Sequence, residues 1–302
     1  MRFTYEVPTS LEEAVALMEK YGTEAKILAG GTDLVIQLQE EKVRPKVIVD
    51  ITRIEELKTL ELRQDSLIIG SLCTFSEIAL SPKVNKYATA LARAAATVGS
   101  PQIRNQGTLG GNLANASPAA DSIPALLCLE SKVGVISSFG ANEVNLEDLL
   151  GGVGFTNLKP NEIITYFRIP VKKDFYSSYA KLGRRNALAI ARISIGLAVV
   201  LEGGKIREVA VALGAVGPTA YRVPSIEQLL VGREPMEKVW PDVEEQLGIE
   251  VGNKIAGRVS VPYKREAVKG VVQEAWEQLF RSISGSKVSG RLPGNGGEAS
   301  GI

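Results

Sequence analysis

The stretch Thr108-Leu-Gly-Gly-Asn-Leu-Ala-Asn-Ala-Ser-Pro-Ala-Ala-Asp121 contains a Gly-Gly pair beside small and polar residues. An earlier stretch, Lys26-Ile-Leu-Ala-Gly-Gly-Thr-Asp33, repeats this arrangement. Glycine lets the backbone approach a ligand closely and adopt conformations that other residues avoid. N–H groups at a turn or at the start of a helix can then surround a negative charge. Two such stretches, far apart in one chain, predict a phosphate-bearing cofactor that is held from two sides.

Other phosphate-binding motifs are missing from both stretches. Neither reads Gly-x-Gly-x-x-Gly, which is the usual dinucleotide fingerprint, and neither reads Gly-x-x-x-x-Gly-Lys-Ser/Thr, which marks a nucleotide-hydrolysing loop. An isolated Gly-Gly pair is most often a plain turn. The interpretation therefore depends on the residues around the two pairs.

Those surrounding residues resemble one family. Ala29-Gly-Gly-Thr-Asp-Leu34 and Ser100-Pro-Gln-Ile-Arg-Asn-Gln-Gly-Thr-Leu-Gly-Gly-Asn112, followed by Asp121, resemble the FAD-binding medium subunit of the molybdenum hydroxylases. This is the family of xanthine, carbon monoxide and nicotinate dehydrogenases. Two later segments, Tyr179-Ala-Lys-Leu-Gly-Arg-Arg185 and Arg258-Val-Ser-Val-Pro-Tyr-Lys-Arg-Glu266, resemble parts of the C-terminal domain of that subunit.

The resemblance covers about residues 1–284 and implies a fold of the α+β class. It predicts a two-part FAD-binding domain of the vanillyl-alcohol-oxidase/PCMH type over residues 1–175, with subdomains of about 1–55 and 56–175. A smaller α/β C-terminal domain is expected over residues 176–283. Residues 284–302 are rich in Gly and Ser with little to bury, which predicts a disordered tail.

The resemblance also implies which residues bind FAD. The two glycine stretches are expected to line the diphosphate, and three later residues to contact other parts of the cofactor. The predicted cofactor-binding residues are Lys26, Ile27, Leu28, Ala29, Gly30, Gly31, Thr32, Asp33, Thr108, Leu109, Gly110, Gly111, Asn112, Asp121, Ile164 and Lys181. No catalytic side chain and no metal ligand is expected in this chain.

Several of these residues have a plain structural alternative. Asp121 is interpreted as an acceptor for a sugar hydroxyl, but it could instead cap a helix. Lys181 is interpreted as a cation near the flavin that tunes its electronics, but it could be a solvated lysine on a strand. Ile164 could be ordinary strand core. Arg184 and Arg185 are either surface charges or subunit contacts.

The amino-acid composition excludes or disfavours several kinds of binding site and catalytic site. The 302 residues carry a net charge of +1, which disfavours nucleic-acid binding through a broad basic surface. Histidine is absent, so a Ser-His-Asp triad, histidine zinc ligands and histidyl-linked flavin are excluded. The two cysteines, Cys73 and Cys128, are too few for an iron–sulfur cluster and fit a reducing compartment. No signal region or membrane span is apparent, so a cytoplasmic location is expected.

Local patterns predict individual elements. Val47–Asp50 is expected to be a strand, Pro82 to about Val98 one helix, and Glu202-Gly-Gly-Lys205 a hairpin turn. Ser10-Leu-Glu-Glu13 and Thr74-Phe-Ser-Glu77 are interpreted as capping boxes. The longest helix is expected from Tyr263 to Ile283. Its apolar stripe is expected to pack in a core: Val268, Val271, Val272, Ala275, Trp276, Leu279 and Ile283.

The resemblance implies an oxidoreductase subunit of the xanthine dehydrogenase type in a cytoplasmic heterotrimer. Its partners would be a large molybdopterin-binding subunit and a small [2Fe–2S] subunit, and electrons would pass through FAD to an acceptor such as NAD⁺. Two other interpretations stay open: a self-contained flavin-dependent oxidoreductase, and a structural module that has lost flavin.

Overall fold

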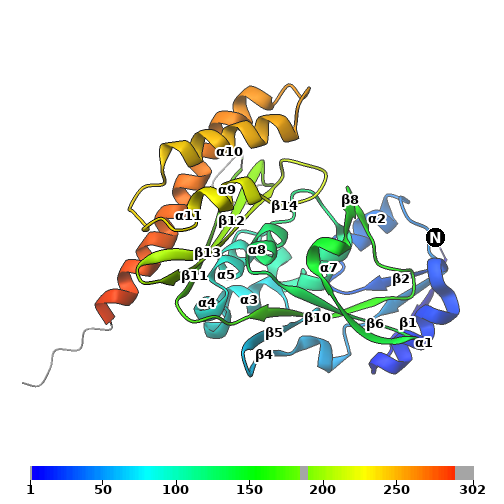
Figure 1. Ribbon diagram of the computed structural model, residues 1–302. Coiled ribbons are helices and arrows are strands. Elements are labelled where there is room, and N and C mark those ends of the chain that lie inside the picture. The colour runs from blue at the N-terminus through cyan, green and yellow to red at the C-terminus, as the bar shows by residue number, and fades with distance from the viewer. Residues whose placement is uncertain (1, 184–189, 290–302) are drawn as a thin grey trace, which may run out of the picture.

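The computed structural model describes residues 2–183 and 190–289, so Arg184 and Arg185 lie outside the described residues. The described chain forms three large sheets with their helices, following one another along the molecule, and a fourth sheet of two short strands (Figure 1). The first part is a three-stranded parallel sheet of strand order β1-β3-β2 with helices beside it. Its elements are β1 (Thr4–Glu6), α1 (Leu11–Tyr21), β2 (Ala25–Leu28), α2 (Leu34–Gln39) and β3 (Val47–Asp50).

Local sequence explains these elements. The strand Val47–Asp50 is confirmed with its predicted bounds, and all four residues are buried. Ser10 caps α1 by accepting the N–H of Glu13, and Gly22 ends it at a positive φ of 50°. The Glu13 carboxylate accepts from Thr9 N at 2.8 Å, one residue before the position that a capping box requires. The predicted capping box therefore forms its first bond, from Glu13 N to the Ser10 side chain. In its second bond, Thr9 N takes the place of Ser10 N.

The second part is a five-stranded antiparallel sheet of order β4-β5-β10-β6-β7, with helices packed over it. Its strands are β4 (Leu60–Arg63), β5 (Ser66–Gly70), β6 (Lys132–Ser137), β7 (Gly140–Asn145) and β10 (Ile163–Pro170), with the short pair β8 (Leu150–Gly152) and β9 (Phe155–Thr156) beside it. Its helices are α3 (Phe75–Leu80), α4 (Pro82–Tyr87), α5 (Thr89–Ala96), α6 (Pro101–Gln106), α7 (Leu109–Asn115) and α8 (Ser122–Cys128). The predicted capping box at Thr74 and Glu77 is confirmed with both of its bonds.

The single helix expected from Pro82 to Val98 is wrong. The chain leaves helical geometry at Ala88, where φ is −144° and ψ is 50°, and a new helix starts at Thr89. Ala88 itself is fully buried. After the bend, the alanine-rich α5 packs against both α3 and β11.

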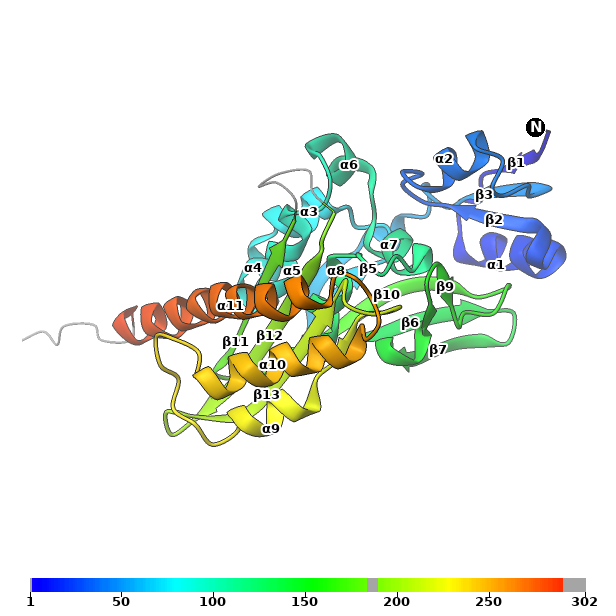
Figure 2. The ribbon, with the colours of Figure 1, turned by 90° about the horizontal axis from the view of Figure 1, so that it is seen from above.

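The third part is a four-stranded antiparallel sheet between two layers of helices (Figure 2). Its elements are β11 (Phe175–Leu182), β12 (Ile193–Glu202), β13 (Lys205–Gly214), β14 (Tyr221–Arg222), α9 (Pro224–Leu230), α10 (Pro241–Lys254) and α11 (Val261–Ser289). On β12, Ile195 and Leu197 belong to the core shared with α11, whereas Ala198 belongs to the core of the second part. This period-2 alternation buries both faces of the sheet.

The predicted hairpin between β12 and β13 is confirmed. Glu202 pairs with Lys205, and the two glycines between them have φ of 58° and 83°. Positive φ at both central positions is the geometry of a type I′ hairpin loop, which glycine adopts without strain.

The final helix is longer than the sequence predicts. Every residue of its predicted apolar stripe is buried, from Val268 to Ile283. The helix, however, continues to Ser289, so the disordered tail predicted from residue 284 is wrong for residues 284–289. The rest of that prediction, residues 290–302, lies outside the described residues.

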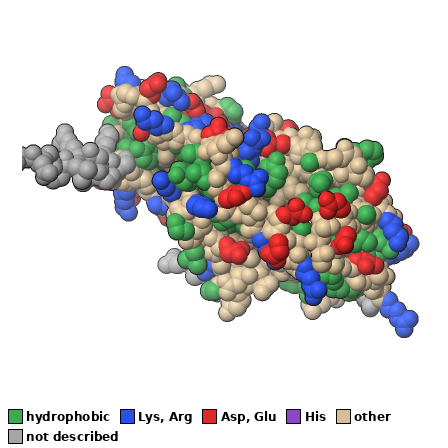
Figure 3. Space-filling view, turned by 90° about the horizontal axis from the view of Figure 1, so that it is seen from below, with side chains coloured by type: hydrophobic (Ala, Val, Ile, Leu, Met, Phe, Trp, Pro, Cys, Tyr) green, Lys and Arg blue, Asp and Glu red, His purple; other side chains and the backbone are tan. Residues whose placement is uncertain are grey.

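The surface carries mixed charge. On the face shown in Figure 3, acidic and basic side chains are interspersed rather than gathered by sign. Within residues 2–183 and 190–289, no helix combines the length and the apolar character that crossing a bilayer requires.

Candidate functional site

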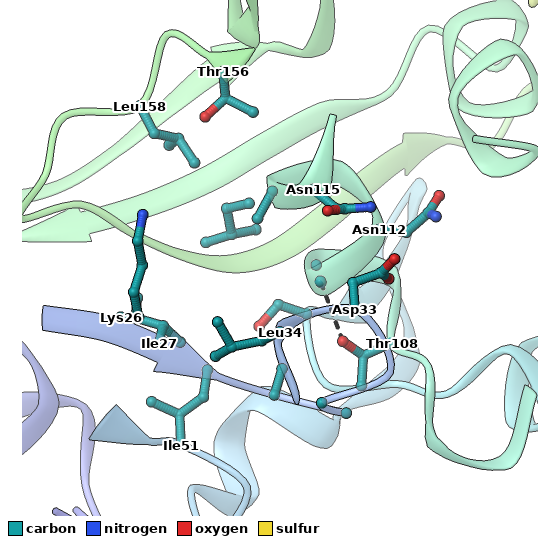
Figure 4. Close-up of a pocket in the computed structure, with 18 of the residues that line it drawn as sticks. Lys26, Ile27, Asp33, Leu34, Ile51, Thr108, Asn112, Asn115, Thr156 and Leu158 are labelled. Carbon is teal, nitrogen blue, oxygen red and sulfur yellow. Dashed lines mark hydrogen bonds between the residues drawn. The ribbon is translucent and has the colours of Figure 1, made fainter. Parts of the chain in front are cut away.

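A cleft of about 510 Å³ opens where the first part of the chain meets the second (Figure 4). Pockets for small-molecule cofactors commonly have volumes of about 300–1,000 Å³. Both glycine stretches line it, together with the ends of β5 and β10 and the β9 region. The sequence therefore predicted correctly that two distant segments share one cavity.

Close approach of the two stretches depends on Gly30. A Cβ at this position would lie 1.8 Å from the carbonyl oxygen of Gln106, so any side chain would push the stretches apart. Gly31 follows with a φ of 71°, in the left-handed region that favours glycine. The first Gly-Gly pair is thus needed to bring the two walls of the cleft together and to turn the chain into α2.

The first stretch presents unused backbone donors to the cleft. Within the described part of the chain, the N–H groups of residues 30–34 donate to no protein acceptor. All five of these residues line the cleft. Successive N–H groups without a protein acceptor can form a concave site for an anion where they point into the same space.

The second stretch does not match its predicted role. Leu109 N donates to the carbonyl oxygen of Cys73 at 3.0 Å, and Gly110 N to that of Ser71 at 2.8 Å. Gly111 N donates to Thr108 Oγ1 at 3.1 Å, the bond drawn at Thr108 in Figure 4. Asn112 N donates to the carbonyl oxygen of Thr108. The expectation that these N–H groups are free donors for a diphosphate is wrong. Two of them hold the start of α7 against the segment that follows β5, and the other two bond to Thr108.

The second stretch still supplies side-chain donors. Thr108 Oγ1 accepts from Gly111 N and keeps its own hydroxyl proton for another partner. The carboxamide oxygens of Asn112 and Asn115 accept from Ser122 Oγ at 2.6 Å and from Gln37 Nε2 at 3.4 Å. Both amides line the cleft.

Lys26 adds a positive charge to the same cleft. Lys26 extends from β2 across the cavity toward the wall that carries Leu158 (Figure 4). Asp33 and Glu162 also line the cleft, so its walls carry charges of both signs. A phosphate group in this space would rely mainly on the free N–H groups and on Lys26.

Twelve of the sixteen predicted cofactor-binding residues line the cleft. They are Lys26, Ile27, Ala29, Gly30, Gly31, Thr32, Asp33, Thr108, Gly110, Gly111, Asn112 and Ile164. Leu28 lies beneath the first stretch, where its side chain faces Gly31, and Leu109 is fully buried in the core of the second part. Asp121 and Lys181 do not line the cleft either.

Asp121 and Lys181 instead bind each other. Lys181 Nζ donates to Asp121 Oδ2 at 2.7 Å and to the carbonyl oxygen of Thr97 at 2.7 Å. Tyr179 donates its hydroxyl proton to Asp121 Oδ1 at 2.6 Å. Asp121 precedes α8 but makes no side-chain capping bond, so the capping alternative is wrong. The solvated-strand alternative for Lys181 is also wrong, because its side chain is 11% exposed.

Burial dominates the titration of this cluster. Burial raises the pKa of Asp121 above its ordinary value, and the charge of Lys181 and the two hydrogen bonds oppose that rise. Burial also raises the pKa of Tyr179 well above that of a free tyrosine, and the Asp121 carboxylate raises it further. Tyr179 therefore remains a hydrogen-bond donor at any physiological pH.

Several residues that line the cleft carry no motif in the sequence. Phe75, Val98 and Ile103 give it an apolar region. Phe155, on β9, lines it as well and is 61% exposed. Side chains of this kind are indistinguishable from core residues in a sequence, because only the long-range packing of their loops exposes them to the cavity.

Comparison with known proteins identifies the family. Residues 1–172 match the family described as FAD binding domain in molybdopterin dehydrogenase, and residues 177–279 match the CO dehydrogenase flavoprotein C-terminal domain. The nicotinate dehydrogenase FAD-subunit of Eubacterium barkeri is 35% identical over 94% of this chain and 98% of its own length. The glyceraldehyde dehydrogenase medium chain of Sulfolobus acidocaldarius is 28% identical over 92% of this chain and 98% of its own.

Solved structures agree with the sequence comparison. Carbon monoxide dehydrogenase from Hydrogenophaga pseudoflava superposes with a TM-score of 0.84 at 27% identity, covering 93% of this chain and 98% of the other. The Cu,Mo-CO dehydrogenase also gives a TM-score of 0.84, at 26% identity over 92% of this chain and 97% of the other. The α+β fold class is thereby confirmed, as a PCMH-type FAD-binding domain followed by a C-terminal domain. The chain belongs to the family of FAD-binding medium subunits of the molybdenum-containing dehydrogenases.

Proposed function

We propose that this chain binds FAD in the cleft and serves as the flavin subunit of a molybdenum hydroxylase complex. One observation carries the binding part of the proposal. Within the described chain, the five successive N–H groups of residues 30–34 have no protein acceptor, and all five residues line the cleft. These residues are partly or fully exposed, so water can satisfy the N–H groups of the cofactor-free chain, and an anionic ligand would replace that water with charge-assisted hydrogen bonds.

The residues fit a diphosphate flanked by larger groups. The N–H groups of the first stretch and the Lys26 ammonium supply positive potential, and Thr108 and the two asparagine amides supply further hydrogen bonds. Gly111 lines the cleft and has no side chain to occupy it. Phe75, Val98 and Ile103 offer an apolar wall for an aromatic ring. When bound, FAD would supply the redox chemistry that no side chain here supplies.

The buried pair is proposed to act beside the flavin. Lys181 holds a positive charge between Asp121 and the carbonyl oxygen of Thr97, and the next residue, Val98, lines the cleft. The Asp121 carboxylate compensates most of this charge, so the pair would act on the flavin through its dipole and its hydrogen bonds. The proposed contact between Asp121 and a sugar hydroxyl requires its carboxylate to accept a further bond beside Tyr179 and Lys181, which a carboxylate can do.

The path of electrons is proposed from the family. A large molybdopterin-binding subunit would oxidise the substrate, a small [2Fe–2S] subunit would carry the electrons to this chain, and NAD⁺ would accept them. Relatives are named for nicotinate and glyceraldehyde, which are chemically unlike. That variety supports placing substrate recognition on a partner chain.

The test begins with the purified full-length chain. We expect a flavin absorption spectrum, with the yellow colour left in the supernatant after acid precipitation, because no histidine is present to attach flavin covalently. Absence of flavin, together with failure to bind added FAD, would support the alternative of a structural module and refute the binding proposal.

Co-expression with a large molybdopterin-binding subunit and a small [2Fe–2S] subunit of this family tests the complex. We expect molybdenum and iron to co-purify with this chain, and the chain alone to hydroxylate no heteroaromatic compound. Hydroxylation by the isolated chain would favour the alternative of a self-contained flavin oxidoreductase.

A further inference from the structure

Ser71 has a buried hydroxyl without a partner. The residue follows β5, is 3% exposed and lines the cleft. Within the described residues, its Oγ has no hydrogen-bond partner. A buried hydroxyl that forms no hydrogen bond destabilises the protein, so such groups are uncommon unless a ligand or water satisfies them.

The backbone of Ser71 joins the walls of the cleft. Its N–H donates to the carbonyl oxygen of Thr165 at 2.9 Å, one residue after Ile164 on β10. Its carbonyl oxygen accepts from Gly110 N at 2.8 Å, in the second glycine stretch. A Cβ on Gly110 would lie 2.6 Å from the Cβ of Ser71, so the stretch lies directly against this side chain.

The Ser71 hydroxyl adds a hydrogen-bond donor beside the second glycine stretch, where most backbone donors are already used. Its backbone N–H groups from Leu109 to Asn112 are already donated within the protein. Apart from the N–H of Thr108, hydrogen bonds to a diphosphate from this wall must therefore come from side chains. Thr108 provides one hydroxyl, and Ser71 provides a second one beside the same glycines.

We propose that the Ser71 hydroxyl donates a hydrogen bond to a diphosphate oxygen of the bound cofactor. This rests on the proposed function, because it assumes that FAD occupies the cleft. The bond forms only in the loaded protein, so Ser71 contributes to affinity and not to the stability of the cofactor-free chain.

The test compares two serines. Ser131 is also buried, also has an Oγ without a partner in the described chain, and does not line the cleft. For the full-length chain stripped of flavin, we expect Ser71→Ala to weaken the Kd for FAD by about 10- to 100-fold, as for loss of a hydrogen bond to a charged group. Ser131→Ala should leave that Kd unchanged. Neither substitution should lower the Tm of the flavin-free protein, since each removes an unpaired hydroxyl.

Two further measurements keep the test decisive. Ser71→Cys keeps most of the side-chain volume but replaces the hydroxyl with a weak donor, so we expect it to weaken FAD binding in a folded protein. ADP carries the diphosphate without the flavin, so its affinity should fall in Ser71→Ala as well. An unchanged Kd for FAD in both Ser71 variants, or an unchanged affinity for ADP, would overturn the assignment. Failure of the unsubstituted chain to bind FAD would instead refute the proposed function.

Discussion

Gly111 is the glycine whose missing side chain opens onto the cleft. A Cβ here would meet Thr108 Oγ1 at 2.9 Å and Ala29 Cβ at 3.9 Å, so valine would reach into the space between the two stretches. Overpacking of this kind costs about 1–3 kcal/mol, which corresponds to roughly 5- to 150-fold in affinity. We therefore expect Gly111→Val to fold but to lose most of its FAD, as measured by the flavin-to-protein absorbance ratio.

A matched control separates this effect from valine itself. Gly270 lies exposed on α11, and a Cβ at this position would meet no atom within 4 Å, so Gly270→Val should keep its FAD. Gly110→Val should behave differently from both, because its side chain would collide with Ser71 and disturb the fold. Full FAD occupancy in folded Gly111→Val would remove Gly111 from the site.

The Asp121–Lys181 pair gives a second prediction at this scale. Both side chains are nearly buried, at 8% and 11% exposed. Removing one partner of a buried ion pair costs about 3–5 kcal/mol, because the other charge loses its compensation. We expect Asp121→Ala to lower the free energy of unfolding by that order in urea titrations. The double variant Asp121→Ala/Lys181→Met should be less destabilised, and a strictly additive loss would contradict the coupling.

Single residues show where sequence reasoning ends. Gly30 and Gly31 signal a special backbone in the sequence, and the structure places both at the cleft. The hydrogen bond from Gly110 N to Ser71 joins residues 39 positions apart, and no local pattern encodes such a contact. The same holds for Asp121, whose partners on β11 replace the helix-capping role that its local sequence suggests.

At the scale of elements, β12 and α8 approach unusually closely. A Cβ on Gly196 of β12 would lie 2.4 Å from the carbonyl oxygen of Pro124 and 2.9 Å from Cys128 Sγ. We expect Gly196→Ala to destabilise the protein by about 1–3 kcal/mol through overpacking. Gly252→Ala is the control, since its Cβ would meet only Arg265 at 3.8 Å and helix propensity favours alanine. Equal thermal midpoints for the two variants would show that the interface yields easily.

Elements with a strong local signal are the ones that sequence predicts well. The hairpin at residues 202–205 and the strand Val47–Asp50 follow from turn chemistry and continuous apolar character. No glycine or proline marks the break at Ala88. The break accompanies the packing of α5 against β11, which no local pattern encodes. The sequence does not predict α10, since its apolar residues are spread weakly along a segment with a glycine at 248 and another at 252.

For the whole molecule, the last residues provide a test. Residues 290–302 include glycines at 290, 294, 296, 297 and 301 and few apolar residues. Ordering such a segment would cost conformational entropy with little apolar burial in return. We expect a chain that ends at Ser289 to keep its flavin content and thermal midpoint. A chain that ends before Val261 should be insoluble or unstable, because it loses the stripe of α11.

Loss of flavin or of partner binding by the chain that ends at Ser289 would show that residues 290–302 form an ordered contact.

The proposed domain boundary at about residue 175 is tested by limited proteolysis, which should cut the chain near that point.

Helix α8 is buried between the second and third parts of the chain, which affects how domains can be exchanged between relatives. All seven residues of this helix are buried, and the third sheet covers it with a face of Gly196, Ala198, Ala210 and Ala212. A C-terminal domain transplanted from a relative would bring its own pattern of small and large residues to that face. Chimeras joined between β10 and β11 take α8 from one parent and the facing strands from the other. We therefore expect them to be less soluble than chimeras in which α8 is exchanged together with the C-terminal domain.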